Sequence, residues 1–271
     1  MKDLSTRFPV WFCDIWGVVH NGYKPFLPTT SALTEHRKNG GVVILVTNSP
    51  RTASGVEKQL ADIGVSHQSY DAVVTSGDVT RTLITEHGGG KIFHLGPKRD
   101  YSIYDGLNIK CVELADAESV LCTGLFDEVN EIPTDYIPLL TSMIEHRLTM
   151  ICANPDKVVR KGEKLIYCAG ALAEEYKNLR GKVLMAGKPY TPIYNLAVLT
   201  AENILGQHLT GDKILAIGDG PETDIKGATD FGLSCVLITG GINEEKDLEA
   251  HVKRLVPEAK ILRAVPELDW P

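Results

Sequence analysis

The run Val42-Val43-Ile44-Leu45-Val46 is apolar at every position. A strand with one solvated face would alternate apolar and polar residues, so an unbroken run is typical of a strand buried on both faces of a parallel sheet. Similar short runs recur along the chain, and most are followed by polar residues and then by a stretch with helical character. This alternation of strand and helix predicts an α/β fold with a doubly wound, Rossmann-like parallel sheet.

The N-terminal and C-terminal parts of the chain both show this alternation of predicted strands and helices. Glycine pairs, prolines and small polar residues mark where the predicted elements stop. The strands expected in these two parts cover residues 10–13, 42–46, 72–74, 183–186, 213–217 and 234–239, and the helices cover about 30–39, 55–63 and 192–205.

The middle of the chain has a strand and helix alternation of its own. Strands are expected at 91–95, 119–123 and 149–153, and a helix opened by Pro133 is expected from about 134 to 146. A segment of this length is large enough to fold as a domain. We therefore predict an α/β domain at residues 78–182, inserted into a core domain formed by residues 1–77 and 183–271.

Composition excludes several classes of protein. The chain has 271 residues and a formal net charge of −7, whereas a nucleic-acid groove would be basic. No apolar run has the length of a membrane span, and the first nine residues lack the apolar centre of a signal peptide. The six cysteines form no C-x-x-C pair, as expected of free thiols. We predict a cytoplasmic protein without a nucleic-acid or membrane partner.

Polar residues capable of chemistry follow four of the predicted core strands. Parallel strands bring their carboxyl ends to one edge of the sheet, so these residues are expected to converge there. They are Asp14, Thr47 with Asn48, Lys188 in Gly-Lys-Pro, and Asp219 with Asp224 in Gly-Asp-Gly-x-x-x-Asp.

These residue types suit phosphoryl transfer. One carboxylate can attack phosphorus, and others can hold a hard divalent cation, which prefers oxygen ligands. A lysine and a hydroxyl-plus-amide loop can neutralise phosphoryl oxygens. Taken singly, each piece has a structural alternative: a helix cap at Thr47, a solvated turn at Lys188, and a tight turn at Asp219.

The ordered set resembles the haloacid dehalogenase (HAD) superfamily of phosphatases, class IIA, over nearly the whole chain. The resemblance implies that Asp14 is the nucleophile, that Thr47 and Asn48 bind phosphate, and that Lys188 serves both catalysis and phosphate binding. The inserted domain takes the place of the family's cap. The cap segments Ala153-Asn154-Pro155-Asp156 and Cys168-Ala169-Gly170-Ala171 also resemble those of class IIA.

The resemblance further implies a Mg²⁺-dependent phosphatase that acts on a small phosphorylated metabolite, such as a sugar phosphate, through a phospho-aspartate intermediate. Substrate selection is then expected from Asn154 and Asp156, and a homodimer formed through the cap is a hypothesis for the oligomer. The implied metal ligands are Asp14, the carbonyl oxygen of Trp16, Asp219 and Asp224.

One position departs from the family pattern. The phosphatases usually carry a second aspartate two residues after the nucleophile, as general acid and base, and here that residue is Trp16. Indole exchanges no proton near neutral pH. General acid–base catalysis typically contributes about 10²–10⁴-fold, or roughly 3–5 kcal/mol of barrier. His20 is the candidate to replace this aspartate in catalysis, because a histidine side chain has an unperturbed pKa of about 6.5. Two alternatives stay open: His20 only packs in its loop, or the leaving group departs without a proton donor.

Two other functions stay open. Trp16 favours a catalytically weak or inactive relative that binds a phosphorylated ligand in a regulatory role. A phospho-accepting receiver domain also uses Asp, Thr and Lys at sheet ends. The inserted domain, the acidic pair and the length of this chain argue against a receiver.

Overall fold

A computed structural model describes residues 1–161, 164–241 and 247–270. The chain divides into two compact units, each made of segments distant in sequence. The core unit comprises Met1–Thr47, Ser54–Val74 and Lys188–Pro271, and the inserted unit comprises Asn48–Ala53 and Thr75–Gly187. In the described part of the chain, no helix is both long enough and apolar enough to cross a membrane.

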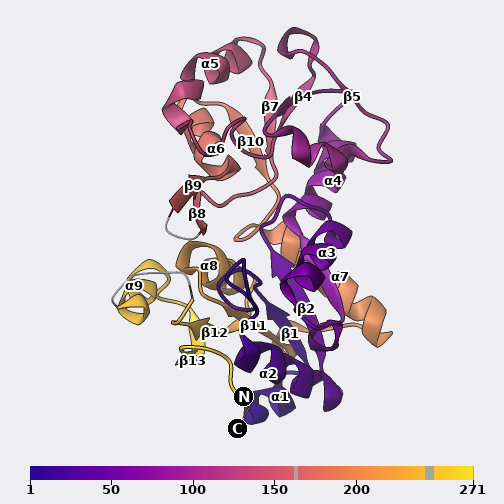
Figure 1. Ribbon diagram of the computed structural model, residues 1–271, viewed down its shortest axis with the longest axis vertical. Helices are drawn as coiled ribbons and strands as arrows, with labels where there is room; N and C mark the ends of the chain where they lie inside the picture. Colours follow the sequence, from indigo (N-terminus) through magenta and orange to yellow (C-terminus); the bar gives the residue numbers. More distant parts are fainter. Residues whose placement is uncertain (162–163, 242–246, 271) are drawn as a thin grey trace. The chain divides into compact units, whose positions relative to one another are not determined.

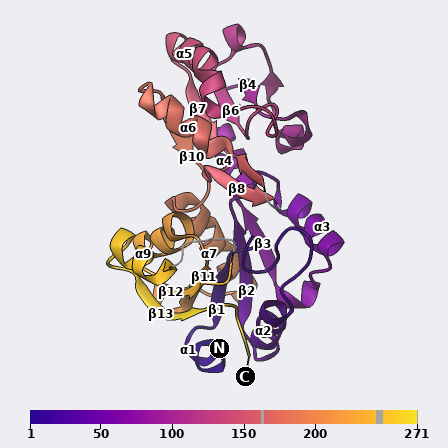
Figure 2. The same cartoon turned by 60° about the vertical axis from the view of Figure 1, so that its left-hand side comes forward.

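The core unit is built on a six-stranded sheet in the order β13-β12-β11-β1-β2-β3 (Figure 2). Its central strand, β1, pairs in parallel with β2 and β11, and β11 pairs in parallel with β12. All four residues of β1 and all six of β2 are buried, which explains why both runs lack alternation. The strands are β1 (Val10–Cys13), β2 (Val42–Thr47), β3 (Ala72–Thr75), β11 (Ile214–Gly218), β12 (Ser234–Ile238) and β13 (Lys260–Val265).

The strand order places a switch point beside β1. The chain proceeds outward through β2 and β3 on one side, and through β11, β12 and β13 on the other. In sheets of this kind, ligands bind at the carboxyl ends of the strands where the order reverses. The core helices are α1 (Lys2–Arg7), α2 (Leu27–Lys38), α3 (Ala53–Ile63), α7 (Thr191–Leu205), α8 (Lys226–Asp230) and α9 (Leu248–Leu255), labelled in Figure 1.

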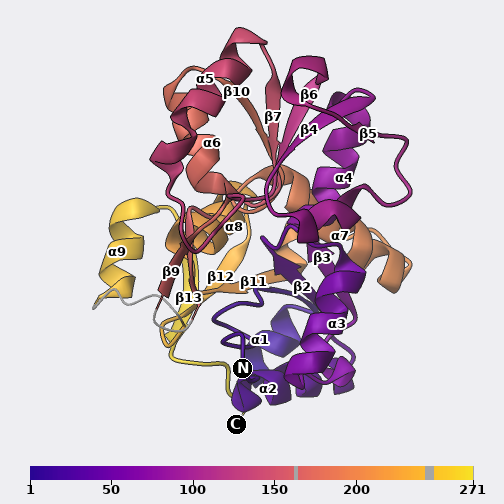
Figure 3. The ribbon, with the colours of Figure 1, turned by 45° about the horizontal axis from the view of Figure 1, so that its top comes forward.

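The inserted unit has a five-stranded sheet in the order β10-β7-β6-β4-β5, and its pairings are parallel (Figure 3). Residues of α5 and α6 pack on one face, including Leu140 and Tyr176, and Ile84 of α4 packs on the other. The elements are α4 (Ser76–His87), β4 (Lys91–Leu95), β5 (Lys110–Cys111), β6 (Ser119–Cys122), α5 (Ile137–Glu145), β7 (Thr149–Cys152), an antiparallel hairpin of β8 (Val158–Lys161) and β9 (Lys164–Tyr167), α6 (Ala169–Asn178) and β10 (Lys182–Met185).

The predicted α/β class with a parallel-sheet core and an inserted α/β domain is confirmed, but the predicted domain boundaries differ from those of the structure. The strand expected at 183–186 was assigned to the core, whereas β10 pairs with β7 in the inserted sheet. Val183 packs on one side of that sheet and Leu184 on the other, so both faces of β10 are covered within the inserted unit. The core resumes at Lys188 rather than at 183, and the inserted unit begins at Thr75 rather than at 78.

Smaller differences have local causes. The helix expected from residue 30 begins at Leu27, because Pro28 is tolerated in a first helical turn. The stretch expected as one helix from 134 starts as a 3₁₀ turn, Pro133–Tyr136, before α5. Residues 48–53 were expected in the core and belong to the inserted unit. The elements expected from the sequence do not include α1, α4, α6, α9, β5, β13 or the β8–β9 hairpin.

A buried histidine ties α2 to the central strand and makes the core unit sensitive to acid. His36 is fully buried, its ring stacks on Trp11 of β1 at 3.9 Å, and Ser5 Oγ lies 2.7 Å from its Nδ1. Burial lowers the pKa of His36 to about 4. The unfolded chain, with a histidine pKa near 6.5, therefore binds the proton first as the pH falls.

We predict that His36 stabilises the fold fully above about pH 6.5 and that this contribution is lost as the pH falls toward 4. At pH 5 the loss is about 2 kcal/mol relative to pH 7. His36→Phe keeps a ring against Trp11 and should narrow the difference between unfolding free energies at pH 7 and pH 5, measured in urea. Ser5→Ala removes only the hydrogen bond, so its pH dependence should match that of the wild type. An unchanged difference in His36→Phe would contradict the prediction.

Candidate active site

Asp14 lies where β1 ends, at the switch point of the core sheet. The four residues before it are buried between β2 and β11, and its backbone N–H donates to the carbonyl oxygen of Ile217 at 2.8 Å. This bond extends the pairing of β1 with β11 by one residue. It fixes the direction in which the largely buried Asp14 side chain leaves the sheet.

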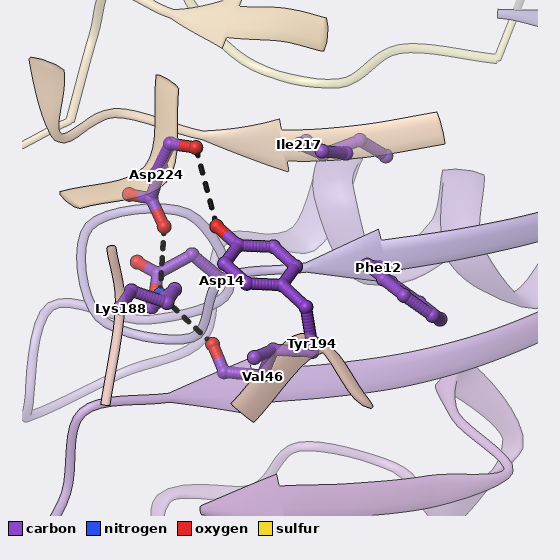
Figure 4. Close-up of a pocket in the computed structure, with 8 residues that line it drawn as sticks. Phe12, Asp14, Val46, Lys188, Tyr194, Ile217 and Asp224 are labelled. Carbon is purple, nitrogen blue, oxygen red and sulfur yellow. Dashed lines mark hydrogen bonds and ion pairs between the residues drawn. The ribbon is translucent and has the colours of Figure 1, made fainter. Parts of the chain in front are cut away.

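Lys188 joins the neighbouring segments around Asp14 (Figure 4). Its ammonium donates to Asp14 Oδ1 at 2.5 Å, to Asp224 Oδ1 at 2.7 Å and to the carbonyl oxygen of Val46 at 2.9 Å. These acceptors come from the ends of β1 and β2 and from the loop after β11. An ammonium has three donors, and these acceptors match all three. The side chain is 4% exposed, so the contacts are shielded from water.

The acidic pair follows β11. Asp219 comes directly after the strand, and Asp224 lies in a short π-helical turn, Pro221–Ile225. Asp224 Oδ2 accepts the backbone N–H of Gly220 at 3.0 Å, while its Oδ1 binds Lys188. Both aspartates are buried. The structure therefore brings together Asp14, Lys188, Asp219 and Asp224, as the spacing of the motifs predicted.

The charged groups of this cluster shift the pKa values of Asp14 and Lys188. Burial raises the pKa of the Asp14 carboxyl well above its usual value, the Lys188 ammonium opposes that rise, and the carboxylates of Asp224 and Asp219 add to it. Burial alone would lower the pKa of Lys188, but Asp14 and Asp224 raise it well above its ordinary value. Lys188 contacts two of the three clustered carboxyl groups, and such a cluster of oxygens favours a further cation.

The donor set fits a divalent metal ion. Asp14, Asp219 and Asp224 each offer an oxygen, and these oxygens lie within 4.8 Å of one another. Mg²⁺ binds oxygen ligands at about 2.1 Å in an octahedron, which requires ligand oxygens separated by roughly 3–4 Å. Mg²⁺ would supply positive charge for these carboxylates and for phosphoryl oxygens. The Trp16 carbonyl as an additional ligand stays a prediction.

Thr47 and Asn48, the predicted phosphate-binding residues, end β2 and begin the loop after it. Both are buried. Asn48 Nδ2 donates to Asp156 Oδ1 at 2.8 Å, and both of these residues belong to the inserted unit. Asn154 Oδ1 accepts the backbone N–H of Asp156 at 3.0 Å, so this side chain shapes its own turn. Phosphate binding by Thr47 and Asn48, and substrate binding by Asn154 and Asp156, stay predictions.

Trp16 and His20 pack together in the loop after β1. Their rings meet edge to face with centroids 5.3 Å apart. Gly22 adopts a φ of +89°, and a Cβ there would lie 2.6 Å from the Trp16 ring, so only glycine fits. The backbone N–H of Gly22 donates to His20 Nδ1 at 2.9 Å.

The surroundings of His20 favour a structural role. Burial lowers its pKa to about 4, so about one His20 in a thousand is protonated at pH 7. With Nδ1 accepting from Gly22, the neutral ring carries its proton on Nε2. The role of His20 as surrogate acid stays a prediction, and the alternative that it organises the loop gains support.

One residue of the cluster was not found from the sequence. Tyr194 of α7 is buried, and its hydroxyl lies 3.4 Å from the backbone carbonyl oxygen of Asp224, to which it donates. It lines a small cavity with Phe12, Asp14, Lys188 and other core residues (Figure 4). In the sequence it is one apolar position of a helix, and only the tertiary contact distinguishes it.

Known proteins resemble this chain in sequence and in fold. A family model described as haloacid dehalogenase-like hydrolase matches residues 11–110, and one described as HAD-hydrolase-like matches residues 185–266. A crystal structure of a haloacid dehalogenase-like hydrolase from Brucella suis is 46% identical, covers 99% of this chain and 98% of that chain, and has a TM-score of 0.90. The chain belongs to the haloacid dehalogenase-like hydrolase family. The predicted family is confirmed, and the protein is an enzyme of the hydrolase class.

More distant relatives of this HAD hydrolase share its fold. A structure of a sugar phosphatase, described as possible, from Cytophaga hutchinsonii is 19% identical with a TM-score of 0.83, covering 100% of this chain and 97% of that one. The D-glycerol 3-phosphate phosphatase of Mycobacterium tuberculosis is 20% identical, with 100% of this chain and 77% of the relative covered. A glycerol phosphate phosphatase structure from that organism, in complex with magnesium, has a TM-score of 0.74 at 19% identity, covering 98% and 76% of the two chains.

We predict that removal of one carboxylate weakens Mg²⁺ binding. Asp219→Asn should lower the affinity measured by isothermal titration calorimetry by at least about tenfold, because even outer partners of metal ligands contribute that much. Asp230→Asn makes the same change of charge at an exposed ion pair with Lys226 and is the control. Equal affinity in Asp219→Asn and the wild type would contradict this site.

Proposed function

We propose that this HAD hydrolase is a Mg²⁺-dependent phosphatase that acts on a small phosphorylated metabolite. The observation that carries the proposal is the contact of Lys188 with Asp14 and Asp224 beside Asp219, at the carboxyl end of the central strand. A buried carboxylate, a buried ammonium and an oxygen set for a cation are the parts that phosphoryl transfer needs. The names of the distant relatives agree with this chemistry.

The first half-reaction forms a phospho-aspartate. A carboxylate oxygen of Asp14 attacks phosphorus, a new P–O bond forms to Asp14, and the P–O bond to the alcohol breaks. The ammonium of Lys188 favours the ionised form of Asp14 and would also attract a phosphoryl oxygen. Thr47 and Asn48, at the end of β2, would hold the other phosphoryl oxygens through their hydroxyl, amide and backbone N–H groups.

The second half-reaction restores the enzyme. Water attacks phosphorus, the P–O bond to Asp14 breaks, and inorganic phosphate leaves. The alcohol takes up a proton in the first step, and the water gives one up in the second. Trp16 has no group to exchange these protons near pH 7, so alcohols of low pKa should leave most readily.

The proposed substrate class rests on the charge of the site and on the names of the relatives rather than on a specific contact. The acidic cluster with its cation suits a phosphate monoester, and the relatives named for glycerol phosphate and sugar phosphates suggest a polyol or sugar part. The resemblance noted in the sequence implies that Asn154 and Asp156 contact that part. A homodimer through the inserted unit stays a hypothesis for the oligomer.

A second function is a phospho-ligand binding protein that turns over slowly or not at all. Trp16 is the observation that favours it, because the residue is packed against His20 and Gly22 and presents no acid. Such a protein would keep Lys188, the carboxylates and the cation while losing hydrolysis. Turnover measurements separate the two functions.

We predict Mg²⁺-dependent release of inorganic phosphate in a screen of phosphorylated metabolites and p-nitrophenyl phosphate with the purified protein. Asp14→Asn removes the nucleophile and should lower kcat by at least about 10³-fold, since the covalent route is then closed. Binding of phosphate with no turnover above the Asp14→Asn background would refute the phosphatase and support the binding protein.

We also predict that restoring a carboxylate at position 16 raises activity on alkyl phosphates. Trp16→Asp should exceed Trp16→Asn, its match in size without an acid, by at least about tenfold in kcat on glycerol 3-phosphate. The gain on p-nitrophenyl phosphate should be much smaller, because its leaving group needs no proton. Equal rates for the Asp and Asn variants would show that position 16 no longer faces the leaving group.

His20→Gln completes the comparison of proton donors. If His20 supplies the proton, the substitution should slow alkyl phosphate hydrolysis much more than aryl phosphate hydrolysis. A similar loss on both substrates would assign His20 to the loop, as its pKa of about 4 indicates.

A further inference from the structure

The side chain of Asp156 is directed at a residue of the predicted phosphate-binding motif. Its Oδ1 accepts a hydrogen bond from Asn48 Nδ2 at 2.8 Å, across 108 positions of sequence. Asn48 is 5% exposed, so its amide is shielded from solvent. A hydrogen bond from a buried amide to a carboxylate is stronger than one between neutral groups. The side chain of Asn48 is therefore oriented by Asp156.

The backbone of Asp156 is fixed as well. Its N–H donates to Asn154 Oδ1 at 3.0 Å, and its carbonyl oxygen accepts the N–H of Gly170, at the start of α6, at 3.1 Å. The carboxylate thus extends from a turn held on both sides. A group with so little freedom is suited to holding another residue in place.

Gly187 brings a third segment to the same amide. A Cβ at this position would lie 2.3 Å from Asn48 Oδ1 and 2.8 Å from Pro155 Cδ, so no larger residue fits without movement. Gly187 is the last residue of the inserted unit, and Lys188 is the first of the returning core. Asn48 likewise follows Thr47, the last core residue before the chain first enters the inserted unit.

Two segments that carry phosphate-binding residues therefore meet at the Asn48 amide. Thr47 is one peptide bond from Asn48, and Lys188 is one peptide bond from Gly187. A shift of the Asn48 side chain would disturb both segments, because Gly187 lies in van der Waals contact with its Oδ1. Asp156 holds the opposite end of that amide.

We propose that Asp156 is a positioning residue for the phosphate-binding segments, acting through Asn48, and not a selector of the organic part of the substrate. The proposal rests on the phosphatase function above. It departs from the role expected of Asp156 in the sequence. A positioning residue affects the phosphoryl group, which all substrates share, whereas a selector affects substrates differently.

The test compares Asp156→Ala and Asp156→Asn on glycerol 3-phosphate and p-nitrophenyl phosphate. Asp156→Ala should lower kcat/KM by about tenfold, the scale of one hydrogen bond to a charged group, and equally for both esters. Asp156→Asn retains an acceptor for Asn48 Nδ2 and should recover most of the loss. Asp116→Ala removes an exposed acid of the same unit and is the control.

A double-mutant cycle with Asn48→Ala tests the route of the effect. If Asp156 acts through Asn48, Asp156→Ala should cost less than about twofold once Asn48 is already alanine. Additive losses would overturn the proposal, and so would a change of more than about threefold in the ratio of kcat/KM between the two esters.

Binding of inorganic phosphate in the presence of Mg²⁺, measured by calorimetry, gives a readout without turnover. The affinity should fall in Asp156→Ala by a factor similar to the loss in kcat/KM and recover in Asp156→Asn. If the wild-type protein hydrolyses no ester, the phosphatase function fails, and this measurement still decides the role of Asp156. Unchanged phosphate affinity in Asp156→Ala would overturn the proposal.

Discussion

The ammonium of Lys188 is the contact on which the rest of the core site depends. It is buried and binds Asp14, Asp224 and the carbonyl oxygen of Val46. The Lys188 ammonium opposes the rise that burial causes in the pKa of Asp14. Lys188 therefore favours the ionised form of the proposed nucleophile and also joins three segments that are distant in sequence.

That contact requires the topology of the sheet. β1 lies between β2 and β11, so the residues that follow these strands emerge at a single edge beside the switch point. The order of the strands supplies the convergence, and the apolar strands supply the burial that strengthens each charge interaction. The same edge gathers the carboxylate oxygens of Asp14, Asp219 and Asp224, a donor set that favours a divalent cation.

The loop after β1 carries Trp16 at the position where the family usually has a second aspartate, while Asp14, Lys188, Asp219 and Asp224 are present. Trp16 fills the loop against His20 and Gly22, and the buried His20 has a pKa of about 4. Asp14, Lys188, Asp219 and Asp224 make none of these ring contacts. Under the proposed function, binding of a phosphoryl group and transfer of the leaving-group proton would therefore be separable.

The sequence by itself determined the α/β class, most strands of the parallel sheets and the convergence of Asp14, Lys188, Asp219 and Asp224. It could do so because strands buried on both faces must be apolar throughout, and because parallel strands present their ends at a common edge. Helices α4 and α6 were not predicted from the sequence.

Only the tertiary structure decided which sheet each strand joins. Residues 183–186 would suit either sheet, and the structure places them beside β7. An apolar run indicates that a strand is covered by other residues, but it does not indicate which strands lie on either side. The partners of polar side chains were equally hidden: Asp156 bonds Asn48, Tyr194 approaches Asp224, and His20 is desolvated. Those contacts join residues far apart in the chain or depend on local burial, and neither quantity is encoded in the spacing of a motif.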